Sequence, residues 1–189
     1  STKELKQLSK KFNVPTAFEF RVVSDTGSAD FNESRVIRMF SNGYNIKYKN
    51  KVHEQISASI KEIGVNILRS NSIIHHDGYN SEFVDQKAKQ KRNIPLLEEM
   101  MKEEPEFYYW PYNLGISHLA IGNNDLAIDY LNQAYSDKLH VNIKAAILNI
   151  LGGIYKNQEN WEKVKDVALK SVKMVEHQYL GYMLSLIHI

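Results

Sequence analysis

The first 80 residues are organised in short hydrophobic runs, some continuous and some alternating with polar residues, and each run ends at turn-forming residues. Runs of this length that are rich in valine, isoleucine and phenylalanine are typical of β-strands. The sequence therefore predicts a sheet-containing half, preceded by a short polar helix at residues 3–11. Strands are expected at residues 18–23, 35–40 and 71–76.

A β-hairpin is expected around Asn42 and Gly43, which stand between the run at residues 35–40 and a further run at residues 44–48. Both turn residues tolerate positive φ, and Asn-Gly is a strong signal for a two-residue hairpin turn. The pattern thus predicts that the two flanking runs pair with each other.

From Ser81 onward the hydrophobic residues recur with helical spacing, and strand-like runs disappear. Residues 81–104 are predicted to form a connecting helix that is kinked or restarted at Pro95, because proline lacks the amide hydrogen that a helix interior uses. Residues 105–178 are predicted to be wholly helical.

This helical part contains an internal repeat in which Leu114 corresponds to Leu151, 37 positions later. The offset is close to the roughly 34 residues of a tetratricopeptide repeat. Further positions correspond at the same offset, and their spacing of three and four places them on one helix face. The repeated set is Leu114, Gly115, His118, Ala127, Leu131 and Ala134, matched by Leu151, Gly152, Tyr155, Val164, Ala168 and Ser171.

Polar turns at residues 122–125 and 157–160 separate the paired helices, and their side chains are suited to cap the second helix of each pair. The repeat therefore predicts two tetratricopeptide-like helical hairpins. Generic helical hairpins are the alternative, because small-residue helix packing requires a similar pattern.

Composition narrows the function classes. Hydrophobic residues make up 43% of the 189-residue chain, and 24 basic residues nearly balance 22 acidic ones. Such a balance does not favour nucleic-acid binding, and the basic run at residues 87–92 is expected to be a solvated helix face. The absence of cysteine excludes disulfides and thiolate metal sites, so imidazole and carboxylate groups must hold any metal.

No hydrophobic run reaches the ~18 residues that indicate a membrane span, and the N-terminal residues lack a signal-peptide core. We therefore expect a cytoplasmic protein without a transmembrane segment, with peripheral attachment to a membrane left open. Residues 184–189 resemble a translated sequencing adapter, so we expect a non-native tail there.

Two polar clusters on the strand-like half are candidates for chemistry: His53 with Glu54, and His75 with His76. A zinc-protease motif is excluded, because its second histidine would fall at position 57, which is Ser57. A self-contained metal site of two histidines and a carboxylate remains an alternative that the spacing does not decide.

The order of four segments is more specific than any one of them: residues 35–40, 52–56, 73–79, and the helix at 87–97 that leads into the repeats. Residues 18–176, taken together, resemble the C-terminal part of family 2 glycosyltransferases that carry tetratricopeptide repeats. The resemblance implies an α+β chain in which residues 1–80 are the acceptor-side part of a GT-A type catalytic domain, followed by the connecting helix and an all-α repeat array.

The resemblance also implies a nucleotide-sugar donor, a glycan, lipid or protein acceptor, and a divalent cation such as Mg²⁺ or Mn²⁺. In that family the nucleotide is held by an N-terminal half that ends in an acidic Asp-x-Asp motif, and these 189 residues do not contain such a motif. We therefore expect the chain to be a fragment that is inactive alone.

Inverting transfer requires a carboxylate that takes the proton of the acceptor hydroxyl, and cationic groups that stabilise the departing diphosphate. Glu54 suits the base, His53 is suited to orient it or to contact phosphate, and Arg35 and Arg38 are candidates for binding phosphate. The resemblance implies a metal-binding histidine on the late strand.

His75 and His76 are the two candidates for that ligand. Successive strand residues point to opposite faces, so at most one of them is expected to face the site. Alternation with Ile74 favours His76, and His75 remains open.

A noncatalytic module is the competing function, with the repeats binding a protein partner through their concave surface. The aromatic run at residues 107–112 would then be a peptide-binding surface; packing between the connecting helix and the first repeat is its other interpretation.

Overall fold

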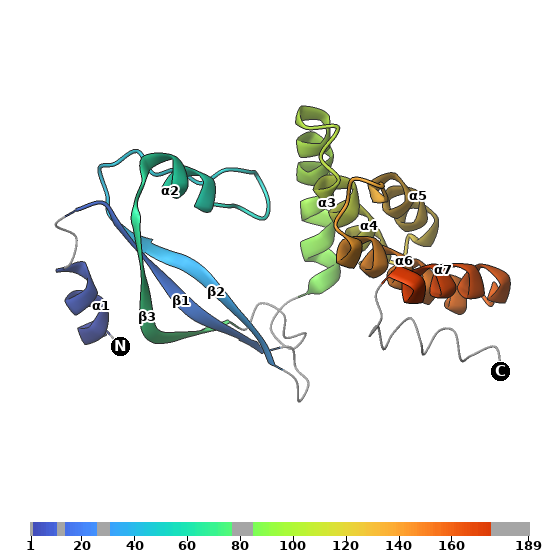
Figure 1. Cartoon of the computed structure of the whole chain (residues 1–189), viewed down its shortest axis with the longest axis horizontal. Coiled ribbons are helices and arrows are strands. Elements are labelled where there is room, and N and C mark those ends of the chain that lie inside the picture. Colours follow the sequence, from blue (N-terminus) through green and yellow to red (C-terminus); the bar gives the residue numbers. More distant parts are fainter. Residues whose placement is uncertain (1, 11–13, 26–30, 77–84, 175–189) are drawn as a thin grey trace. The chain divides into compact units, whose positions relative to one another are not determined.

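The computed structural model describes residues 2–10, 14–25, 31–76 and 85–174 (Figure 1). The chain divides into two compact units, Ser1–Lys89 and Gln90–Ile189, and each unit is considered alone. The first carries a small sheet and the second is helical. The predicted α+β class is therefore confirmed.

The sheet of the first unit has three strands in the order β2-β1-β3. The central strand pairs antiparallel with β2 and parallel with β3. The three predicted strands are thus confirmed, and each is longer than its hydrophobic run. Their bounds are β1 (Thr16–Asp25), β2 (Phe31–Phe40) and β3 (Asn66–His76), and the unit's helices are α1 (Thr2–Ser9) and α2 (Ser57–Ile63).

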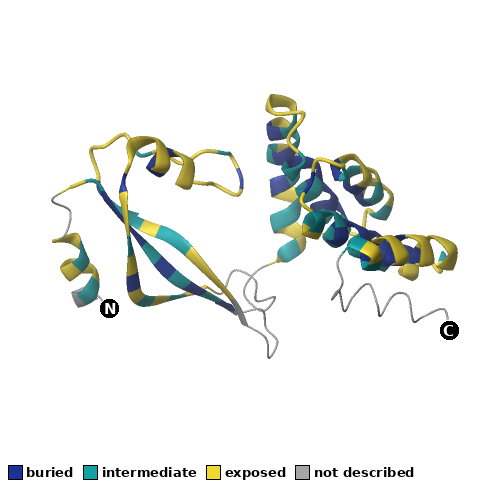
Figure 2. Cartoon of the chain, in the orientation of Figure 1, coloured by how far each residue is buried: buried dark blue, intermediate teal, exposed yellow. Residues whose placement is uncertain are grey.

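Side chains along β1 alternate between two environments, as the pleat of a strand requires (Figure 2). Phe18, Phe20 and Val22 are buried, whereas Glu19 and Arg21 are half-buried on the other face. We call the first side the phenylalanine face and the second side the arginine face.

Helix α2 covers one end of the arginine face. Ile56 and Ile60 form a hydrophobic cluster with Ala17 at the start of β1 and with Val65, which precedes β3. Ile37 of β2, on the same side as Ala17, packs against this cluster. Helix α2 ends at Gly64, whose φ of 70° is the left-handed conformation that glycine adopts at low cost. The sequence pattern did not predict this helix.

The prediction of a hairpin around Asn42 and Gly43 is wrong. Gly43 does turn, with φ of 87°, but residues 44–48 form no strand and β2 pairs with β1 instead. The physical reason is burial: a strand at 44–48 would have had to pair beside β2, whereas Ile46 packs into the α2 cluster and draws the chain away from the sheet.

Helix α3 (Gln86–Glu103) runs through Pro95 without a restart. Pro95 and Lys91 are both exposed, so water can bind the Lys91 carbonyl that has no amide partner at position 95.

Two helical hairpins follow. Helix α4 (Tyr109–Ala120) packs on α5 (Asn124–Ala134), and α6 (Val141–Asn157) packs on α7 (Trp161–Met174). All twelve repeated positions predicted from the 37-residue offset are buried.

The turns of the two hairpins also correspond. Gly122 and Glu159 both have positive φ, at 89° and 58°. The next residue in each turn donates its amide hydrogen to the carbonyl of the fifth residue before it: Asn123 to His118 and Asn160 to Tyr155, both at 2.9 Å. The repeat is therefore present in the backbone as well as in the side-chain pattern. Within the described ranges, no helix combines the length and the hydrophobicity that a membrane crossing requires.

Gly115→Ala is predicted to destabilise the helical unit. A Cβ atom at Gly115 would lie 2.7 Å from Leu131 Cγ and 3.2 Å from the Ala127 carbonyl oxygen. Overpacking of this kind costs about 1–3 kcal/mol. Gly153→Ala is the matched control, because a methyl group added there would meet nothing within 4 Å, and alanine favours a helix by up to about 1 kcal/mol. Thermal unfolding followed by circular dichroism measures both, and equal melting temperatures for the two variants would contradict the packing described.

We predict that His118 makes the stability of the helical unit sensitive to acid. The residue is 6% exposed, and its ring stacks on Tyr130 with centroids 5.4 Å apart. Its Nε2 atom has no hydrogen-bond partner among the described residues. Burial lowers the pKa of His118, and the negative charge of Glu98 partly offsets that effect. Because the unfolded chain then binds the proton more readily than the folded chain, protonation of His118 favours unfolding. The free energy of unfolding therefore keeps its full value above about pH 6.5 and falls as the pH drops below that value.

We therefore expect the melting temperature to fall between about pH 8 and about pH 5.5, and to fall less in His118→Phe, which keeps a ring against Tyr130. The two proteins differ only at position 118, so the difference between the two curves reports that side chain. Parallel curves would show that His118 does not cause the dependence.

Candidate functional site

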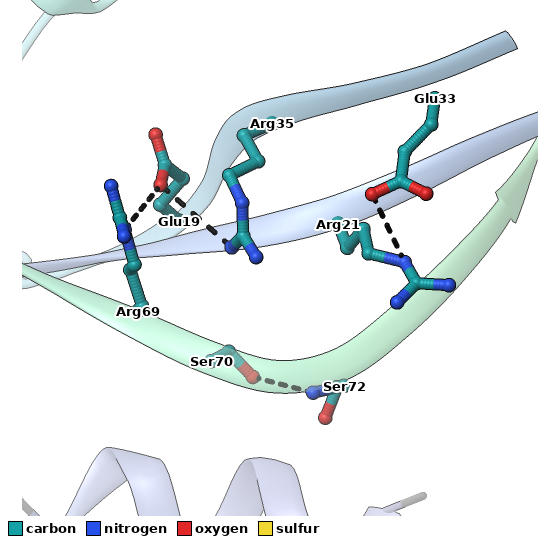
Figure 3. A network of polar contacts seen from close by, with 7 residues as sticks. All are labelled: Glu19, Arg21, Glu33, Arg35, Arg69, Ser70 and Ser72. Atoms are coloured by element: carbon teal, nitrogen blue, oxygen red, sulfur yellow. Dashed lines mark hydrogen bonds and ion pairs between the residues drawn. The ribbon is translucent and has the colours of Figure 1, made fainter.

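The arginine face carries a network of ion pairs across all three strands (Figure 3). Glu19 of β1 lies between two guanidinium groups: its Oε2 atom is 3.9 Å from Arg35 Nη1 and 3.5 Å from Arg69 Nε. Farther along the sheet, Arg21 Nε is 3.2 Å from Glu33 Oε1. Three arginines thus share this face with two glutamates. Exposed ion pairs contribute little to folding, at about 0–1 kcal/mol each, so the network leaves cationic groups available to a ligand at little cost in stability.

The two predicted phosphate-binding arginines occupy different surroundings. Arg35 pairs with Arg21 in the β1–β2 register and contacts Glu19. Arg38 lies at a bulge, where the register shifts between Phe18 and Glu19 and β2 contributes one extra residue. The structure therefore joins Arg35 to the network, whereas Arg38 is the extra residue and has no partner position on β1.

His53 and Glu54 lie in the loop between β2 and α2. Asn45, Asn50 and His53 have φ of 56°, 72° and 54° in this loop. Non-glycine residues adopt this left-handed region rarely, at a cost on the order of 1–3 kcal/mol for a strained case, and such residues concentrate at functional sites. A backbone bridge between Lys49 and Gln55, with N–O distances of 2.8 and 3.0 Å, closes the part of the loop that contains Asn50, His53 and Glu54.

The loop also affects the protonation of His53. Partial burial lowers the pKa of His53, and the negative charge of Glu54 partly offsets this. His53 is thus biased toward the neutral imidazole, the form that accepts a proton. Both side chains reach solvent.

The late histidines lie on opposite faces of the sheet, as alternation predicts. His75 is registered with Val23, which shares the arginine face, whereas His76 is registered with Ser24. His76 Nδ1 is 3.5 Å from Ser24 Oγ on the phenylalanine face. His75, and not His76, therefore shares a face with α2.

Glu54 and His75 are associated with opposite ends of β1. Glu54 is two residues from Ile56, which packs on Ala17. His75 is registered with Val23. Val23 lies six residues after Ala17 along β1, or about 20 Å at the usual strand rise. Among the described residues, no group of three or more histidine, aspartate or glutamate side chains is arranged to hold a metal ion. The self-contained metal site therefore does not form within these ranges, and they supply at most one of these imidazoles to any ion on the arginine face.

Sequence reasoning missed Glu19, Arg21, Glu33 and Arg69 as members of the ion-pair network on the face that carries Arg35. The signal was present, because charged residues at positions 19 and 21 alternate with buried phenylalanines along one strand. What the pattern could not supply was the neighbouring strand and its register.

No family model matches the chain. The chain is similar to the SPbeta prophage-derived glycosyltransferase SunS of Bacillus subtilis (strain 168) and to the glycosyltransferase SunS of Bacillus phage SPbeta. Each is 33% identical over 100 residues, which cover 53% of this chain and 24% of the relative. The chain thus spans about a quarter of the length of the curated relatives it matches. This partial similarity supports a relationship to glycosyltransferases.

Proposed function

We propose that this chain is the acceptor-side part of a family 2, GT-A type glycosyltransferase, which transfers a sugar from a nucleotide donor to an acceptor hydroxyl with inversion. The similarity to proteins named glycosyltransferase carries the proposal, since it extends over 100 residues at 33% identity. The donor would be bound by residues outside this chain, and the chain alone would not turn over. The repeats would bind the acceptor or a protein partner in the cytoplasm.

Glu54 would act as the general base. Its support is chemical: it is an exposed carboxylate in a loop whose backbone adopts the left-handed region at three non-glycine positions. A base in such a loop takes the proton of the acceptor hydroxyl as oxygen attacks the anomeric carbon. His53, biased to the neutral form, would hydrogen-bond the carboxylate and fix its direction.

Arg35 would stabilise the departing diphosphate. It lies on the arginine face, where Glu19 orients its guanidinium group and Arg69 adds a second positive charge. A guanidinium group binds phosphate through two parallel hydrogen bonds. Arg38 is the second candidate for phosphate, with weaker support because of its position at the bulge.

A divalent cation would supply charge stabilisation at the diphosphate. The described residues do not by themselves fit such an ion, since they form no group of three suitable ligands. An imidazole from His75 or His76 would be one ligand, the others would come from outside the described ranges, and for His75 the proposal requires that Glu54 be brought to the ion from the opposite end of β1.

Glu54→Gln is predicted to lower the transfer rate by about 10²–10⁴-fold, the usual contribution of a general base. The test uses the reading frame extended upstream of Ser1, supplied with UDP- and GDP-sugars and a panel of hydroxyl acceptors. Acceptor-dependent release of nucleoside diphosphate is the readout. The melting temperature should not change, because Glu54 is exposed.

Glu62→Gln is the matched control, since Glu62 is an exposed carboxylate on α2 and should leave the rate unchanged. Full turnover by Glu54→Gln would remove Glu54 from the mechanism. An upstream reading frame without any strand pattern or acidic nucleotide site would favour the noncatalytic repeat module instead.

His75→Ala is predicted to raise the Mn²⁺ concentration that gives half-maximal activity, whereas His76→Ala should change it little. The reason is that His75 shares the arginine face with Arg35, and His76 contacts Ser24 on the opposite face. Activity measured over a Mn²⁺ titration distinguishes them. A larger shift in His76→Ala would show that the phenylalanine face holds the metal, and no shift in either variant would exclude both ligands.

A further inference from the structure

An open pocket of about 460 Å³ lies at the turn between α3 and α4. It is lined by Glu104, Pro105, Glu106 and Phe107. All four residues belong to the helical unit, and none of them is among the residues assigned to sugar transfer.

The chemistry of the pocket combines negative charge with an exposed aromatic ring. Five glutamates and one lysine occupy residues 98–106, and the pocket adjoins the C-terminal end of α3, where the helix dipole adds negative potential. Phe107 is 43% exposed, whereas Trp110 of the same aromatic run is fully buried. A cationic group is therefore the ligand that this charge distribution attracts.

The two binding elements are held in position by neighbouring rings. The Trp110 indole donates a hydrogen bond from Nε1 to Glu104 Oε2 at 2.9 Å, which fixes the orientation of that carboxylate. The Phe107 ring stacks on Tyr109 with centroids 5.8 Å apart and meets Trp110 edge-on at 5.6 Å. A pre-oriented carboxylate beside a supported ring loses little conformational entropy on binding.

We propose that this pocket binds an arginine side chain of a protein or peptide partner. A planar guanidinium group stacks on an aromatic face and donates paired hydrogen bonds to carboxylates, which matches Phe107 together with Glu104 and Glu106. Lysine has no planar face to stack and would bind more weakly. This binding does not depend on the proposed transferase activity, because it uses none of those residues.

The test titrates the 189-residue chain with the short neutral-capped peptide Gly-Ser-Arg-Ser-Gly and follows the two tryptophan indole signals by ¹H–¹⁵N NMR. Trp161→Phe assigns the signals, since the chain has two tryptophans. The Trp110 signal should shift on titration, because its indole bonds to the carboxylate that receives the arginine. The same peptide with citrulline, which is isosteric and neutral, should leave it unchanged, and the lysine peptide should shift it less.

Glu106→Gln and Phe107→Leu should each weaken binding about fivefold or more, equivalent to about 1 kcal/mol at 1.4 kcal/mol per tenfold. Glu162→Gln, which removes an exposed carboxylate on α7, is the control and should bind as the wild type does. Both pocket variants leave the buried Trp110 in place, and their unchanged spectra elsewhere would report intact folding. An equal response to citrulline, equal affinity in both pocket variants, or no shift of the Trp110 signal would each overturn the proposal.

Discussion

The strand β1 is the constraint on which the first unit depends, because it is hydrogen-bonded on both sides and its side chains from Phe18 to Val22 alternate between two environments. Burial of Phe18 and Phe20 on one face forces Glu19 and Arg21 onto the other. Because β2 and β3 are in register with β1, their side chains are divided between the same two faces of the sheet. Arg35 and Arg69 therefore contact Glu19. A slip of one residue would place phenylalanine where the arginines lie. The burial of hydrophobic side chains on one face thus places the charged side chains together on the other.

The helical repeat could be predicted from the sequence because its information is local. Contacts between residues three and four apart recur with the helix period, so a match such as Leu114 with Leu151 identifies buried positions directly. The pairing of β2 could not be predicted in the same way. Asn42 and Gly43 carry a strong turn signal, and Gly43 does turn, but the choice of partner strand depends on where Ile46 finds a hydrophobic contact.

The same distinction applies to the candidate site, where some features are visible in the sequence and others depend on tertiary structure. The residue types that suit sugar transfer, among them Glu54 and Arg35, are visible in the sequence because their chemistry is intrinsic. Which of His75 and His76 shares the face of Arg35 is decided by the register against β1, which no local pattern contains. The α3–α4 pocket also depends on a tertiary contact: the bond from Trp110 to Glu104 joins residues six apart, a spacing that is not one of the helical neighbours.

The parallel pairing of β1 with β3 joins residues fifty positions apart, since Thr16 is registered with Asn66. The helical hairpins instead join near neighbours in the chain, and such local contacts form in microseconds to milliseconds. Closing the longer loop carries an entropic penalty before any sheet contact compensates for it. The two units should therefore acquire their structure in sequence. The helical unit would become ordered first, and the sheet would assemble last. On dilution from denaturant, the ion pairs of the arginine face would therefore form after the helical hairpins have folded.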